Sequence, residues 1–174
     1  MIDHPQKQVL RKTDDYNATP LNLAVRLQCV DTDLLQWLTD ADEQVLVIPD
    51  INGALPLHTA VRTEVATVSQ LVFLSSTKQQ QLWNVKDSHG QTPLCAAVYN
   101  CADTDIVRYL LFSIRTDQDR ALALRSVDQY NRTLLHIAMQ RNAVPNMVDL
   151  LIGEAQGPLT IVDNRGDVPL HLLF

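Results

Sequence analysis

The chain has 174 residues, of which 46% are hydrophobic, and this composition is typical of a folded protein and argues against a disordered one. Its formal net charge of −6 argues against a general binder of the nucleic-acid backbone, because such a protein carries excess basic charge. No apolar run approaches the roughly 18–20 residues that cross a bilayer, so no membrane contact is predicted, and residues 1–12 lack the apolar core of a signal peptide.

Five segments of the chain share one pattern. Each has Asp first, Gly or Asn three positions later and Leu seven positions later, and four of them have Pro before that Leu. In chain order they read "DDYNATPLNLA" (14–24), "DINGALPLHTA" (50–60), "DSHGQTPLCAA" (87–97), "DQYNRTLLHIA" (128–138) and "DNRGDVPLHLL" (163–173). Copies that recur at nearly regular intervals along the chain predict a repeat protein whose units stack on one another.

The shared residue types each suit a turn followed by a helix. Gly or Asn adopts the left-handed backbone of a tight turn at the smallest steric cost. In three copies a Thr stands two positions after this Gly or Asn and suits a helix N-cap, and the Pro that follows in most copies fits the first helical turn. The turn also explains the N-glycosylation acceptor patterns at Asn17 and Asn131, which we interpret as turn residues because a secretory context is absent.

A second apolar helix is predicted after four of the five segments. These helices lie within residues 31–38, 67–74, 103–112 and 146–152, where apolar residues recur at helical spacing. A further apolar patch precedes the next Asp and is predicted to pack against its neighbour, at Leu46, Leu82, Leu124 and Leu159. Residues 113–126 are predicted to be an extended helix end followed by a polar loop.

The five segments resemble the ankyrin repeat family, whose signature is D-x-x-G-x-T-P-L-H-x-A with a period of roughly 33 residues. The resemblance implies an all-α solenoid of stacked helix-turn-helix units with short β-hairpin or turn connections. Leu134 departs from the signature Pro, which is tolerable because Leu is a good helix former. On this interpretation residues 1–174 form one domain, with the end of a preceding repeat at 1–13, repeats at 14–49, 50–86, 87–127 and 128–162, and a partial repeat at 163–174.

No residue pattern predicts catalysis, a cofactor or a metal site. His58, His136 and His171 share one repeat position, where the family resemblance implies a hydrogen bond to the backbone of the next turn. Cys95 and Cys101 match no zinc spacing, and the two Asp-Thr-Asp tripeptides fall at predicted helix starts, where capping explains them. Three cysteines form no even framework, which predicts a reducing, cytoplasmic compartment.

The resemblance also implies which positions contact a partner, namely the second, third, fifth, thirteenth and fourteenth from each Asp, on a concave face. In this chain those 23 positions hold five of the ten arginines and three of the four tyrosines, no Lys and no Glu, and a formal charge of +3. Interface hot spots favour Arg and Tyr. The predicted partner-binding residues are Tyr16, Arg26, Arg62, His89, Tyr99, Tyr130, Arg132, Arg141 and Arg165.

The sequence therefore predicts a non-catalytic protein–protein interaction module that binds an acidic, extended or helical segment of another protein. Two alternatives stay open, a regulatory or anchoring domain of a larger channel, kinase or other enzyme, and a structural spacer. The last apolar residues, Leu170, Leu172, Leu173 and Phe174, have no second helix to cover them, which predicts self-association through the C-terminal edge.

Overall fold

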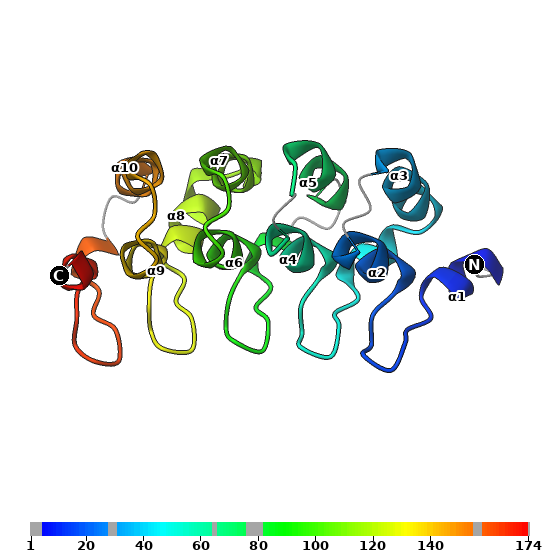
Figure 1. Cartoon of the computed structure of the whole chain (residues 1–174), viewed down its shortest axis with the longest axis horizontal. Helices are drawn as coiled ribbons and strands as arrows, with labels where there is room; N and C mark the ends of the chain where they lie inside the picture. Colours follow the sequence, from blue (N-terminus) through cyan, green and yellow to red (C-terminus); the bar gives the residue numbers. More distant parts are fainter. Residues whose placement is uncertain (1–4, 28–30, 64–65, 76–81, 155–157, 174) are drawn as a thin grey trace.

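The computed structural model describes residues 5–27, 31–63, 66–75, 82–154 and 158–173, which form a row of helix pairs with loops along one edge (Figure 1). The first helices of the pairs are α2 (Pro20–Arg26), α4 (Pro56–Val61), α6 (Pro93–Tyr99) and α9 (Leu134–Gln140). The second helices are α3 (Thr32–Ala41), α5 (Val68–Ser75), α7 (Thr104–Ser113) and α10 (Pro145–Glu154). The remaining elements are α1 (Pro5–Leu10), α8 (Asp117–Arg125) and the 3₁₀ turns η1 (Glu43–Val47), η2 (Leu82–Asn84), η3 (Pro158–Thr160) and η4 (Pro169–Leu173).

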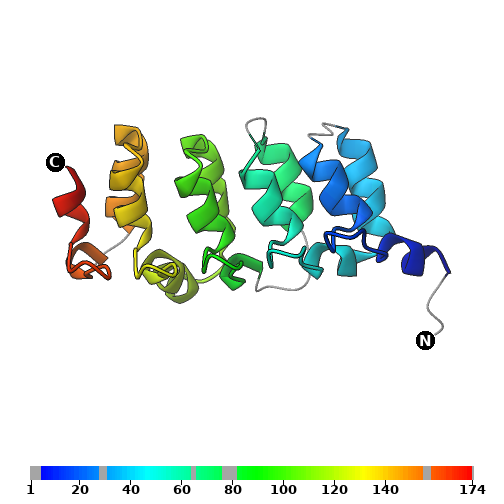
Figure 2. The same ribbon diagram turned by 60° about the horizontal axis from the view of Figure 1, so that its bottom comes forward.

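The helices are arranged in two layers. Each first helix packs against the next first helix, and α9 packs against η4 in the same layer. The second helices α3, α5, α7 and α10 form the other layer, on the side away from the loops (Figures 1 and 2). The two ends of the chain lie at opposite ends of the row. The predicted all-α solenoid is confirmed, and no β-strand occurs in the part of the chain that the structure describes.

The first helices begin where the sequence pattern predicts. Thr19 and Thr92 each accept a hydrogen bond, at 3.2 Å, from the amide three residues later, and a proline follows each threonine. In the second copy Leu55 occupies the threonine position, and its side chain has no hydrogen-bond acceptor. There the backbone amide of Leu55 donates to Nδ1 of His58 at 3.1 Å, so the histidine satisfies the free donor.

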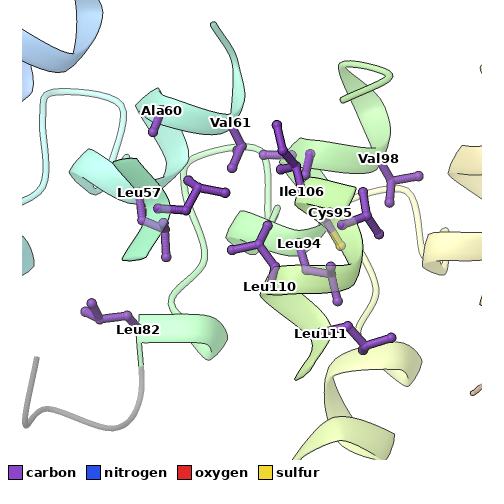
Figure 3. Close-up of a cluster of buried hydrophobic side chains, with 14 of the residues drawn as sticks. Leu57, Ala60, Val61, Leu82, Leu94, Cys95, Val98, Ile106, Leu110 and Leu111 are labelled. Atoms are coloured by element: carbon purple, nitrogen blue, oxygen red, sulfur yellow. The ribbon is translucent and has the colours of Figure 1, made fainter. Parts of the chain in front are cut away.

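The core fills the space between the layers. Figure 3 shows side chains from α4, α6 and α7 in one cluster, with Leu94 and Leu110 near its centre, Leu57 of α4 to their left and Leu82 of η2 at its edge. All four leucines are buried. Burying a leucine side chain stabilises a fold by about 1.5–3 kcal/mol, so a few such residues from each pair hold neighbouring units together.

The expectation for residues 113–126 is wrong. Helix α7 ends at Ser113, and residues 117–125 form the separate helix α8 rather than a polar loop. Thr116 caps α8 by accepting from the amide of Asp119 at 3.0 Å, while Ala123 and Leu124 are buried and α8 packs against α10. A capped start and a short apolar stripe are enough to make this insertion a helix.

The other apolar patches are buried with one exception. Leu46, Leu82 and Leu124 belong to the core, as predicted, whereas Leu159 lies outside the core and is 40% exposed, although its element η3 contacts η4. At the C-terminal edge Leu170 is exposed, and the side chain of residue 173 and the whole of residue 174 lie outside the described residues. Self-association through this edge stays a prediction.

Candidate functional site

Each loop is closed by its first residue, an aspartate. In the third loop, Oδ1 of Asp87 accepts from the amides of His89 and Gln91 at 2.8 and 2.9 Å. The amide of Asp87 donates to the carbonyl of Gln91 at 3.0 Å. The same pair of side-chain bonds recurs at Asp14, Asp50, Asp128 and Asp163. The five loops, residues 14–18, 50–54, 87–91, 128–132 and 163–167, therefore share one self-contained conformation.

The fourth residue of each loop has the left-handed backbone that the sequence predicts. Its φ angles are positive at Asn17, Asn131, Gly53, Gly90 and Gly166. The two asparagines also donate through Nδ2, at 2.7 Å, to the carbonyls of Pro49 and Val162, which lie just before the next loop. A turn conformation and this hydrogen bond account for both asparagines.

Successive loops are joined by one backbone hydrogen bond at their tips. The amide at the second position of each loop donates to the carbonyl at the third position of the loop before it. These bonds run from Ile51 to Tyr16 at 2.9 Å, from Ser88 to Asn52 at 2.8 Å, from Gln129 to His89 at 3.2 Å and from Asn164 to Tyr130 at 3.1 Å. The tips therefore form one connected edge, which together with the exposed sides of the first helices is here called the hairpin face.

A buried histidine ties a first helix to the next loop. Nε2 of His58 lies 3.1 Å from the carbonyl of Gln91, and Nε2 of His136 lies 2.9 Å from that of Asp167. Because Nδ1 of His58 accepts from a backbone amide, Nε2 carries the proton and donates. These bonds confirm the role that the family resemblance implies. Burial lowers the pKa of His58 below its usual value, although Asp87 opposes this shift.

We expect the free energy of unfolding to decrease as the pH falls below about 6.5, the usual histidine pKa, with His58 contributing to the loss. The lowered pKa means that the unfolded chain takes up a proton at a pH where folded His58 stays neutral, which favours unfolding. The matched variant is His58→Asn, because Asn22 occupies the same repeat position. Urea unfolding at pH 7.5, 6.5 and 5.5 should give a shallower pH dependence for His58→Asn, and equal slopes would contradict the prediction.

The structure brings six of the nine predicted partner-binding residues together. Five of them line a groove of about 240 Å³ between the third and fourth loops, here called the inter-loop groove. They are Arg62, His89, Tyr99, Tyr130 and Arg132, alongside Gln91, Asn100, Asp128 and Gln129. The sixth, Arg141, places its guanidinium 4.9 Å from the centre of the Tyr99 ring. The groove thus combines loop tips with the ends of first helices.

Two arginines of the groove form ion pairs with buried loop aspartates. Arg62 is paired with Asp87, and Nη2 of Arg132 lies 2.6 Å from Oδ2 of Asp128, with both carboxylates at most 1% exposed. The Arg132 guanidinium also lies 4.8 Å from the centre of the Tyr130 ring. The net charge of the face is therefore lower than the +3 predicted for the contact positions, because these two aspartates lie outside those positions and neutralise two of the arginines.

The other three predicted residues lie elsewhere on the hairpin face. Tyr16 is 62% exposed at the first loop, while Arg26 at the end of α2 and Arg165 in the fifth loop are also exposed. Arg26 has the same repeat position as Arg62, yet it forms no ion pair within the described residues. Position in the repeat alone does not decide which arginine is paired.

Other kinds of site find little support in the described residues. Within those ranges, no group of three or more His, Cys, Asp or Glu side chains could hold a metal ion. Cys95 and Cys101 are free thiols, and burial raises the pKa of Cys95, which leaves it unreactive. No helix of the part described is long and apolar enough to cross a membrane.

Comparison with known families matches the middle of the chain. The family model for ankyrin repeats, in three copies, matches residues 21–121, which is more than half of the chain. No curated protein matches the sequence.

Proposed function

The chain belongs to the ankyrin-repeat family, and on that premise we propose that it is a non-catalytic module that binds a segment of another protein on its hairpin face. Ankyrin repeats are generally protein–protein interaction modules. The observation that carries the proposal is the inter-loop groove, which is lined by the Arg132–Tyr130 stack and by Tyr99, on which Arg141 stacks. Arg and Tyr are, with Trp, the side chains enriched among the residues that dominate binding energy at protein interfaces.

The rigidity of the face supports the same proposal. Each loop is fixed by its own aspartate and by a bond to its neighbour, and Arg62 and Arg132 are held by buried carboxylates. A face that is ordered before binding loses less conformational entropy when a partner docks. The free thiols of Cys95 and Cys101 suit a reducing compartment, and we place the chain in the cytoplasm on that basis.

The proposal predicts that partner capture depends on the hairpin face. A bait carrying Tyr16→Ala, Tyr130→Ala, Arg141→Ala and Arg165→Ala changes exposed side chains only, and it leaves the two buried ion pairs intact. From lysate of the source cells, the unchanged chain should enrich a protein at least about tenfold over this variant, because each lost hot-spot contact costs more than about 1 kcal/mol. Quantitative mass spectrometry of the two eluates measures the ratio.

The matched control changes exposed residues on the second helices, Trp37→Ala, Val72→Ala and Arg108→Ala, and should capture the same protein as the unchanged chain. Circular dichroism checks that all three baits fold. If the control variant loses the partner and the loop variant keeps it, binding uses the opposite side and the proposal fails. If no bait enriches any protein, the structural-spacer alternative is favoured.

A further inference from the structure

The hairpin face changes character along its length, beginning with an apolar part at the first two loops. Tyr16, Leu27 and Ile51 are 62%, 75% and 65% exposed, and the tip bond between Ile51 and Tyr16 sets their loops side by side. Leu27 has the repeat position of Asn100, which lines the inter-loop groove together with loop-tip residues. The same positions that form a polar groove farther along the row thus present large apolar side chains here.

The opposite part of the face presents arginine and tyrosine side chains. Arg132 of the fourth loop is paired with Asp128, and Arg165 shares the fifth loop with Asp163 and Asp167, so Arg141 at the end of α9 provides the exposed charge. Arg141 is exposed and forms no ion pair within the described ranges, so its charge is available to a ligand. The first loop, in contrast, carries the exposed carboxylates of Asp14 and Asp15, which outnumber the one exposed cation of the same repeat's face, Arg26. An acidic group is therefore attracted to Arg141, beside the third and fourth loops, and repelled by Asp14 and Asp15 of the first loop.

We propose that the hairpin face binds one extended segment with aromatic or aliphatic side chains at the end over the first two loops and acidic side chains at the end over the third and fourth loops, beside Arg141. This inference rests on the proposed function and specifies its partner. Packed helices lie about 8–10 Å apart and an extended chain rises about 3.3 Å per residue. Three intervals separate the first loop from the fourth, so the apolar and acidic groups are spaced about eight residues apart.

The test uses random 16-residue peptides displayed on phage and selected on the unchanged chain. The enriched sequences should share acidic residues at one end and an aromatic or aliphatic residue about eight positions away. Fluorescence anisotropy of the best peptide then compares Arg141→Glu and Ile51→Ser with the matched controls Arg108→Glu and Val72→Ser, which lie exposed on α7 and α5.

Each variant has its own expected outcome. Arg141→Glu should weaken binding of the peptide about tenfold or more. This difference in affinity should shrink at 1 M salt, where charges are screened within about 3 Å. Ile51→Ser should weaken it by several-fold at either salt concentration, because its contact is apolar. Both controls should stay within about twofold of the unchanged chain.

Failure of this inference is distinguishable from failure of the proposed function. Peptides that respond to Ile51→Ser but carry no acidic residues, or that ignore Arg141→Glu, overturn the inference and leave the hairpin face as the binding surface. Peptides that respond only to Arg108→Glu or Val72→Ser overturn both. If nothing is enriched, or if the chain itself forms dimers that Arg141→Glu dissociates in analytical ultracentrifugation, an extended segment of another protein is not the occupant and the inference is overturned.

Discussion

Replacing Arg62 with alanine is expected to lower the free energy of unfolding by about 2–3 kcal/mol, because it leaves a buried carboxylate without its cation. The Asp87 side chain is fully buried and pairs with Arg62, whose own side chain is 30% exposed. The backbone amides of His89 and Gln91 still stabilise the carboxylate in the variant, which keeps the loss below that of an unsolvated charge. Urea unfolding followed by circular dichroism at neutral pH measures the difference.

The chain provides its own control for this substitution. Arg26 occupies the same repeat position, is exposed and has no ion pair among the residues described, so Arg26→Ala should change stability by no more than about 0.5 kcal/mol. Adding Asp87→Asn to Arg62→Ala should restore part of the loss, since the amide oxygen still accepts from the loop and the buried charge is gone. Equal effects of Arg26→Ala and Arg62→Ala would show that the ion pair does not stabilise the fold.

Replacing Gly90 with alanine is expected to cost about 3 kcal/mol through two additive effects. The first is conformational, because φ is +72° and an L-residue pays about 1–2 kcal/mol there. The second is steric, because a Cβ at this position would lie 2.9 Å from the backbone nitrogen of Gln129 and 3.2 Å from the carbonyl carbon of Asp128. Both contacts are backbone atoms of the next loop, and backbone cannot move aside as a side chain can.

Gly166 isolates the conformational part of that cost. Its φ is +86°, and no atom lies within 4 Å of the Cβ that alanine would add, so Gly166→Ala should cost only about 1–2 kcal/mol. The two variants are compared by urea unfolding under the same conditions. If Gly90→Ala is no worse than Gly166→Ala, the close approach of the third and fourth loops does not constrain the stack. Gly53→Ala should fall between them, since its nearest contact is 3.4 Å.

The parts of the fold that depend on local geometry were predictable from the sequence. A left-handed turn residue and a helix start are each specified within a few neighbouring positions, so the amino-acid pattern alone is enough to assign Asn131, Gly90 and Thr92. The loop aspartates were recognised as a pattern, but their role in accepting two backbone amides was not. The sequence does indicate this role, because an Asp at the start of a turn commonly accepts hydrogen bonds from backbone amides farther along the turn.

Several features that depend on packing between units were not predictable. Arg26 and Arg62 share a repeat position, and only the second pairs with a carboxylate, because pairing depends on how the side chain reaches an aspartate 25 residues away. Helix α8 was missed because residues 113–126 are mostly polar, although the burial of Leu124 within this segment was predicted. The clustering of six candidate residues around one groove likewise required the stack itself.

The single backbone bond between successive loop tips bears on how such a chain evolves. At each junction the donor and the acceptor are main-chain groups at fixed positions, so the junction is the same whatever side chains the tips carry. A duplicated unit inserted at a junction could donate its own amide to the carbonyl of the loop before it and accept from the amide of the loop after it, so both junctions would have the same geometry. Gene duplication can therefore lengthen the row, while mutation changes tip residues such as Tyr16, Ile51, His89 and Tyr130 separately. The backbone bonds between the loops are kept when these side chains change, so a new ligand can be selected without a change of fold.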